Sequence, residues 1–231
     1  MRSVDRTGLG GSWFYGLGST GAERRTANLA GLFGVVALLT TAGDPAWPWW
    51  KYAIGAVVAF DLAGGVVANG LDAAKRFYHG PLPLPPTRLN RFLHHEVGFA
   101  AVHLQPVVVG LVFGGPWWWG PLWYAWALAG VVAVSRSPRR LARPVGLFAV
   151  LTGLMLAPAL DGPAGFAWLP AVLLVKLALA HAVPEEPVSE GPAPEGPACD
   201  EPASDEPAAA GTRRPARGTR AGQAPPPAGP G

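Results

Sequence analysis

Charged residues are scarce in this sequence, and their scarcity excludes an ordinary soluble domain. Asp, Glu, Lys and Arg make up 14% of the 231 residues, whereas soluble domains carry about 25%. Half of the residues are hydrophobic, and the few charges lie in short stretches between long apolar runs. This distribution is typical of an integral membrane protein. The net charge of +3 reflects basic residues that membrane topology explains, so we expect no nucleic-acid partner.

Cysteine and the sequence motifs of common enzymes are lacking as well. The single cysteine, Cys199, excludes an intrachain disulfide and indicates neither an oxidising nor a reducing compartment. The sequence contains no Walker loop, dinucleotide fingerprint, nucleophile elbow or C-x-x-C pair. Catalytic residues and cofactors therefore stay unassigned, and function has to be argued from the polar groups within the apolar runs.

Long apolar runs are what the sequence has instead. A membrane-spanning helix needs about 20 residues, with about 17 as a lower limit. Only a helix satisfies its backbone hydrogen bonds within a single span, and these runs are too long for barrel strands. We therefore expect an all-α, multi-pass transmembrane bundle of six helices. The runs cover residues 26–43, 49–70, 92–114, 117–135, 144–160 and 164–183.

The basic residues predict the orientation of this bundle. In a six-span arrangement, 16 of the 18 Lys and Arg residues fall on one side, in alternate loops and in the two ends of the chain. The exceptions are Lys51, at the edge of the second run, and Lys176, inside the sixth. Positive loops face the cytoplasm, so we expect a cell-membrane protein with both termini cytoplasmic.

The first run has an alternative interpretation as a cleaved export signal. Arg24 and Arg25 precede an apolar stretch of the kind that such signals contain. The residues after the arginines lack the usual twin-arginine continuation, and no clear A-x-A cleavage site follows. Cleavage would leave five spans with the same loop orientation.

The two ends of the chain differ from the apolar part. Residues 1–25 are polar and Gly-rich, and we expect a flexible N-terminus there. Residues 184–231 are rich in Pro, Ala and Gly and hold almost no large apolar side chains. Such a segment buries too little surface to offset its ordering entropy, so a disordered cytoplasmic tail is expected. The sequence therefore suggests two partners, the lipid bilayer and a protein that binds this tail.

Three ionisable residues lie deep within the predicted spans. Asp61, His103 and Lys176 are each about ten or more residues from the end of their run, which places them near the bilayer midplane at about 1.5 Å per residue. A charge at that depth costs about 2.5–3.5 kcal/mol on insertion scales. We therefore expect Asp61 to pair with Lys176, with His103 nearby, in a buried polar centre that is either a structural latch or a functional site.

A second polar layer is predicted at the cytoplasmic ends of the helices, with Asn69, Glu96 and His181 as its main members. Histidines near one membrane face suggest a metal site, for which His95, His181 and Glu96 are the candidate ligands. The sequence after His95 begins like the zinc helix H-E-x-x-H, but Phe99 replaces the second histidine. Any such site would need ligands from separate elements.

Two functional classes follow from these residues. In the first, the protein is a non-enzymatic carrier, a proton-coupled factor or a scaffold that works through Asp61, His103 and Lys176. In the second, it is a membrane-embedded metal-dependent enzyme acting on a lipid or isoprenoid at the cytoplasmic face. We favour the first, because the midplane position follows from counting residues, whereas the metal site requires ligands to converge.

Overall fold

The computed structural model describes residues 13–43, 46–81 and 87–184, and within these ranges all regular structure is helical. The helices belong to one compact unit, Met1–Pro187. The predictions made for residues 1–12, for the tail beyond residue 184 and for Cys199 lie outside the described residues.

Helix α2 spans Gly21–Thr41 and begins inside the segment that was expected to be flexible. A capping box explains this start: the Thr20 side chain accepts a hydrogen bond from the Glu23 N–H, and the Glu23 carboxylate accepts one from the Thr20 N–H. The hydrogen bond from the Thr20 backbone lowers the pKa of the Glu23 carboxyl below its ordinary value. Helix α3 follows as Trp49–Gly70, with Pro48 at its N-cap.

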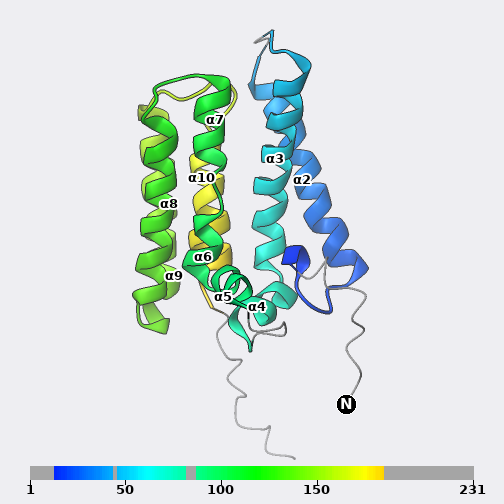
Figure 1. The fold of residues 1–231 in the computed structure, drawn as a ribbon, viewed down its shortest axis with the longest axis vertical. Coiled ribbons are helices and arrows are strands. Elements are labelled where there is room, and N and C mark those ends of the chain that lie inside the picture. The colour runs from blue at the N-terminus through cyan, green and yellow to red at the C-terminus, as the bar shows by residue number, and fades with distance from the viewer. Residues whose placement is uncertain (1–12, 44–45, 82–86, 185–231) are drawn as a thin grey trace, which may run out of the picture. The chain divides into compact units, whose positions relative to one another are not determined.

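Small residues let α2 and α3 approach each other closely, and the two lie side by side in Figure 1. A Cβ atom added to Gly34 would lie 2.6 Å from the Ala63 Cβ and 2.7 Å from the Ala59 carbonyl oxygen. One added to Gly31 would lie 2.7 Å from the Phe60 ring. This pairing by small residues is the usual way in which helices associate when lipid surrounds them.

Replacing Gly34 by alanine should therefore separate the two helices. The new methyl group would collide with backbone, which cannot rotate away, so we expect a loss of about 1–3 kcal/mol in the free energy of unfolding. Gly21→Ala is the matched control, because a Cβ there meets nothing within 4 Å. Unfolding in mixed detergent micelles measures both variants, and equal stabilities would contradict the described packing.

The third apolar run differs from the single helix that was expected. It forms α5 (Arg88–His94), α6 (Glu96–Ala101) and α7 (Gln105–Phe113), with short helix α4 (Asp72–His79) before them. Pro106 gives the physical reason for the break between α6 and α7. Its ring nitrogen cannot donate to the carbonyl one turn earlier, but proline fits the first turn of a new helix.

The remaining helices complete the unit. They are α8 (Trp119–Arg136), α9 (Arg139–Leu156), the short 3₁₀ turn η2 (Ala157–Ala159), α10 (Leu169–Leu174) and the π-helical segment η3 (Val175–His181). Segment η3 continues α10 directly and packs against α3, α8 and α9. The sixth apolar run thus becomes helical only from Leu169 and changes its winding halfway.

Three helical stretches among the described residues are long and apolar enough to cross a membrane: Trp49–Gly70, Glu96–Phe113 and Arg139–Ala159. The apolar helix Leu169–His181 is shorter. Helices α2 and α8 are not among these three stretches.

Large apolar side chains cover the outside of the unit. Phe33 is 72% exposed, Val57 69%, Leu111 80%, Phe148 67% and Met155 71%. Soluble monomers rarely expose so much contiguous apolar surface. The outward faces of α2, α3, α7 and α9 are therefore suited to contact with lipid.

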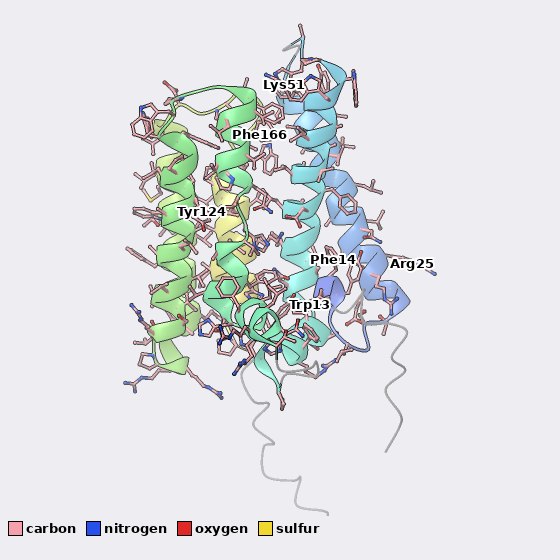
Figure 2. All side chains as sticks on the ribbon, viewed as in Figure 1. Trp13, Phe14, Arg25, Lys51, Tyr124 and Phe166 are labelled. Atoms are coloured by element: carbon pink, nitrogen blue, oxygen red, sulfur yellow. The ribbon has the colours of Figure 1, made fainter. Side chains whose placement is uncertain are left out.

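Aromatic and basic side chains mark the two ends of the helices. Trp49 and Trp117, which are 81% and 84% exposed, define what we call the tryptophan end. Arg25, Arg91 and Arg139 define the arginine end. Figure 2 shows Lys51 beside the tryptophan end and Arg25 toward the arginine end. Tryptophan favours the headgroup boundary of a bilayer. The separation of Trp and Arg side chains to opposite ends of the helices therefore matches a membrane-crossing arrangement.

Candidate functional site

An ion pair joins the middle of α3 to the π-helical segment η3. The Lys176 Nζ donates to the Asp61 Oδ2 at 2.7 Å and to the Asp61 backbone carbonyl at 3.2 Å. The Gln105 Nε2, at the start of α7, donates to the same Oδ2 at 2.8 Å. The Lys176 side chain is 3% exposed, whereas that of Asp61 is 33% exposed. The carboxylate therefore has an open side, and the ammonium group does not.

Gly65 makes room for the lysine. It lies one turn after Asp61 on α3, and a Cβ atom there would lie 2.4 Å from the Lys176 Cε and 2.8 Å from its Nζ. The lysine side chain thus runs across the surface of α3 at a point where only glycine fits. The Cε and Nζ of Lys176 are the atoms that use the space left by the missing side chain.

Two irregular stretches of helix flank the ion pair. Lys176 lies in the π-helix. Gln105 is the first residue of α7, directly after the non-helical residues 102–104 that separate α6 from α7. Short π-helical stretches are frequent at functional sites. Irregular backbone at membrane depth is tolerated where it is buried in protein or lines a cavity. Both irregularities here bring a polar side chain to Asp61.

A cavity of about 790 Å³ opens beside the ion pair. Its walls come from α2, α3, α6 and residues 13–15, and most of its lining is apolar. Representative lining residues are Val35, Val57, Phe60, Phe99 and Val102. Val57 and Val102 are 69% and 50% exposed, so the cavity reaches the outer apolar surface of the unit. Asp61 and Lys176 belong to its wall.

Two further polar side chains line this cavity. His103, which is 7% exposed, makes a 2.7 Å hydrogen bond between its Nδ1 and the Phe99 carbonyl. Asn69 is 5% exposed, and its Nδ2 has no hydrogen-bond partner among the described residues. A buried amide without a partner is costly in apolar surroundings. Asn69 therefore contributes to the wall of the cavity a buried donor that no described residue satisfies.

The other predicted polar residues lie at the arginine end. The Glu96 carboxylate lies 3.5 Å from the His79 Nδ1 and 3.7 Å from the His95 Nδ1. Nearby, the Tyr78 hydroxyl donates to the Trp13 carbonyl at 2.6 Å, and burial raises the pKa of the Tyr78 phenol well above its ordinary value. This end of the bundle is held by side chain to backbone contacts between distant segments.

The candidate metal ligands His95, Glu96 and His181 do not converge. The His95 side chain is 63% exposed beside Glu96, whereas His181 is 1% exposed and stacks on Phe99 with ring centroids 3.9 Å apart. No group of three His, Cys, Asp or Glu residues suited to a metal occurs in the part of the chain that the structure describes. The metal hypothesis therefore receives no geometric support from these residues.

The structure thus brings Asp61, Lys176 and His103 to one cavity, together with Asn69 from the predicted second layer. Glu96 does not line this cavity, and His181 does not line it either, although it stacks on Phe99 in its wall. Sequence analysis missed Gln105, because for the buried polar centre it considered only ionisable residues. A polar amide in an apolar stretch next to Pro106 was the available signal. The functional role of the polar centre remains a prediction.

Comparison of the chain with protein-family models, with curated proteins and with solved structures finds no match.

Proposed function

We propose that this chain is a six-span cell-membrane protein with both termini in the cytoplasm, and that it is a non-enzymatic carrier of an amphiphilic molecule. Six spans are supported by the alternation of basic loops, which a smaller number of crossings would disrupt. The exposed apolar faces of α2 and α9 support the same arrangement, because both need an apolar surrounding.

The observation that carries the carrier proposal is the ion pair on the wall of an apolar cavity. In a latch, both partners would be enclosed, but the Asp61 side chain is 33% exposed while its partner is 3% exposed. The cavity of about 790 Å³ lies within the size range of ligand pockets, about 300–1,000 Å³. Its lining combines a broad apolar surface with a few polar groups, which is the usual composition of a ligand site.

The chemistry of the lining selects an amphiphile from the bilayer. The apolar walls suit a hydrocarbon body, and the exposed Val57 and Val102 place the opening on the outer apolar surface. A polar head would meet the Asp61 carboxylate as an acceptor and the Asn69 Nδ2 as a donor. A head group carrying both a hydrogen-bond donor and an acceptor would therefore complement the partly exposed carboxylate and the unsatisfied amide.

Photo-crosslinking in native membranes tests this function. A benzophenone amino acid replaces Val57 in the cavity or, as the control, Phe33 on the outer surface of α2. Both side chains are about 70% exposed, and each is eight residues from its helix end at the tryptophan end. We expect one dominant adduct mass at position 57 and a mixture of bulk lipids at position 33.

The Asn69→Leu variant makes the test specific, because it removes the unused donor and leaves the ion pair unchanged. We expect the dominant adduct at position 57 to fall about tenfold or more, in line with about 1–3 kcal/mol for a lost hydrogen bond in a buried site. The same bulk-lipid mixture at positions 57 and 33 would contradict the proposal.

A further inference from the structure

A second cavity, of about 440 Å³, lies at the arginine end. Its walls come from α4, α5, the start of α6, the end of α8 and the start of α9. Apart from Tyr78, its residues differ from those of the larger cavity. Its lining is much richer in polar side chains and includes Arg91, Arg139, His94 and His95. The two cavities therefore differ in the kind of ligand that they suit.

The two arginines of this second cavity have no partner within the part of the chain that the structure describes. Neither guanidinium group, of Arg91 or Arg139, makes a hydrogen bond or ion pair with any described residue. The His95 Nδ1 accepts a hydrogen bond from the Val97 N–H at 3.2 Å, so a neutral ring carries its proton on Nε2 and can donate. Three donors are thus available at one opening.

The first turn of α9 adds to these donors. Helix α9 has 18 residues, and its N-cap, Pro138, makes no side-chain hydrogen bond. Ser137, Arg139 and Ala142 of this helix start line the cavity. The first N–H groups of a helix and its dipole favour a bound anion. The helix start therefore acts together with the Arg91 and Arg139 side chains, which no described residue engages, rather than alone.

The other polar groups of the cavity do not cancel this preference. Glu96, the one carboxylate among the described residues of its lining, lies beside two imidazoles, of His79 and His95. The Ser135 and Ser137 hydroxyls donate to carbonyls of α8. With neutral histidines, two guanidinium groups and one carboxylate give the described lining a net positive charge.

We propose that this second cavity binds a phosphate group through Arg91, Arg139 and the His95 Nε2–H. Guanidinium groups match the oxygens of a phosphate in a planar, two-point contact. At the arginine end of a membrane protein, this phosphate belongs either to an anionic phospholipid or to a soluble phosphate monoester. The site is separate from the Asp61–Lys176 cavity, so it can exist whether or not that cavity holds an amphiphile.

Native mass spectrometry of the full chain, released from nanodiscs of mixed phosphatidylglycerol and phosphatidylcholine, tests the lipid source. The test variant is Arg91→Gln with Arg139→Gln. The control, Arg136→Gln with Arg140→Gln, removes the same charge from the same end, but neither arginine lines the cavity. We expect one tightly retained phosphatidylglycerol on the wild type and the control, with about tenfold or greater loss in the test variant.

Titration with glycerol 3-phosphate and inorganic phosphate in detergent tests the soluble source. Binding that depends on Arg91 and Arg139 but not on the control pair would support the phosphate site and assign it to a soluble ligand. Equal losses in the two double variants would overturn the proposal, because they would show nonspecific attraction to basic residues. The proposal also fails if neither lipid nor soluble phosphate binds in an Arg91- and Arg139-dependent way.

Discussion

The Asp61→Leu variant is expected to lose about 3–5 kcal/mol of folding stability, which is the cost of breaking a buried ion pair by removing one partner. The Lys176 ammonium would remain in apolar surroundings with its side chain only 3% exposed. Lys176→Met should cost less, because the orphaned carboxylate is 33% exposed and keeps its hydrogen bond from Gln105. Reversible unfolding in mixed micelles measures both losses.

The double variant Asp61→Leu with Lys176→Met separates charge from packing. Replacing both partners of a buried pair by apolar residues is often neutral, so we expect most of the stability of the wild type to return. The double variant should at the same time lose the dominant adduct in the crosslinking experiment at Val57. Full stability with unchanged adduct formation would show that the ion pair has no part in binding.

Gly65→Val is expected to be nearly as damaging, although it removes no charge. The Lys176 side chain is flexible, but it can escape the new side chain only by leaving Asp61, since the Cβ alone would lie 2.8 Å from its Nζ. The variant therefore both overpacks the helix contact and breaks the ion pair. We expect a loss of about 3 kcal/mol or more in the free energy of unfolding.

Gly70→Val provides the control for this substitution. Gly70 lies on the same helix, and a Cβ there meets nothing within 4 Å. Combining Gly65→Val with Lys176→Met should restore part of the lost stability, because the side chain that collides is then no longer charged and no longer held at Asp61. If Gly65→Val and Gly70→Val unfold alike, the lysine does not cross α3 as described.

The contact between Asp61 and Lys176 could be predicted from the sequence because it depends on one quantity, depth in an apolar run. Both charges lie near the middle of long apolar stretches, and an unpaired charge at that depth is costly. Counting residues is enough to reach this expectation. The close packing of α2 and α3 through Gly31 and Gly34 was not predicted and comes from the structure.

The irregular backbone around the site could not be predicted in the same way. The sixth apolar run was expected to form a regular transmembrane helix, whereas its Val175–His181 part is π-helical. The break before Gln105 depends on Pro106, which could also have produced a kink in a continuous helix. The metal hypothesis did not take into account that the bundle buries His181 and leaves His95 exposed.

Both cavities depend on these irregular segments. The break between α6 and α7 gives His103 and Gln105 to the larger cavity and its ion pair, and the turn between α5 and α6 places His95 at the smaller one. A regular six-helix bundle would bury neither set of polar groups beside an open space. Departures from regular helix therefore locate both proposed sites.

The central claim is that the bundle crosses the membrane six times, and α8 is a proposed span outside the three stretches that are long and apolar enough to cross a membrane. Single cysteines at Trp117 and Ser137, just before and just after α8, test it in a Cys199→Ser background. With a membrane-impermeant maleimide, we predict that Trp117→Cys is labelled in intact cells and Ser137→Cys only after permeabilisation. Labelling of both positions from the same side would contradict the six-span arrangement.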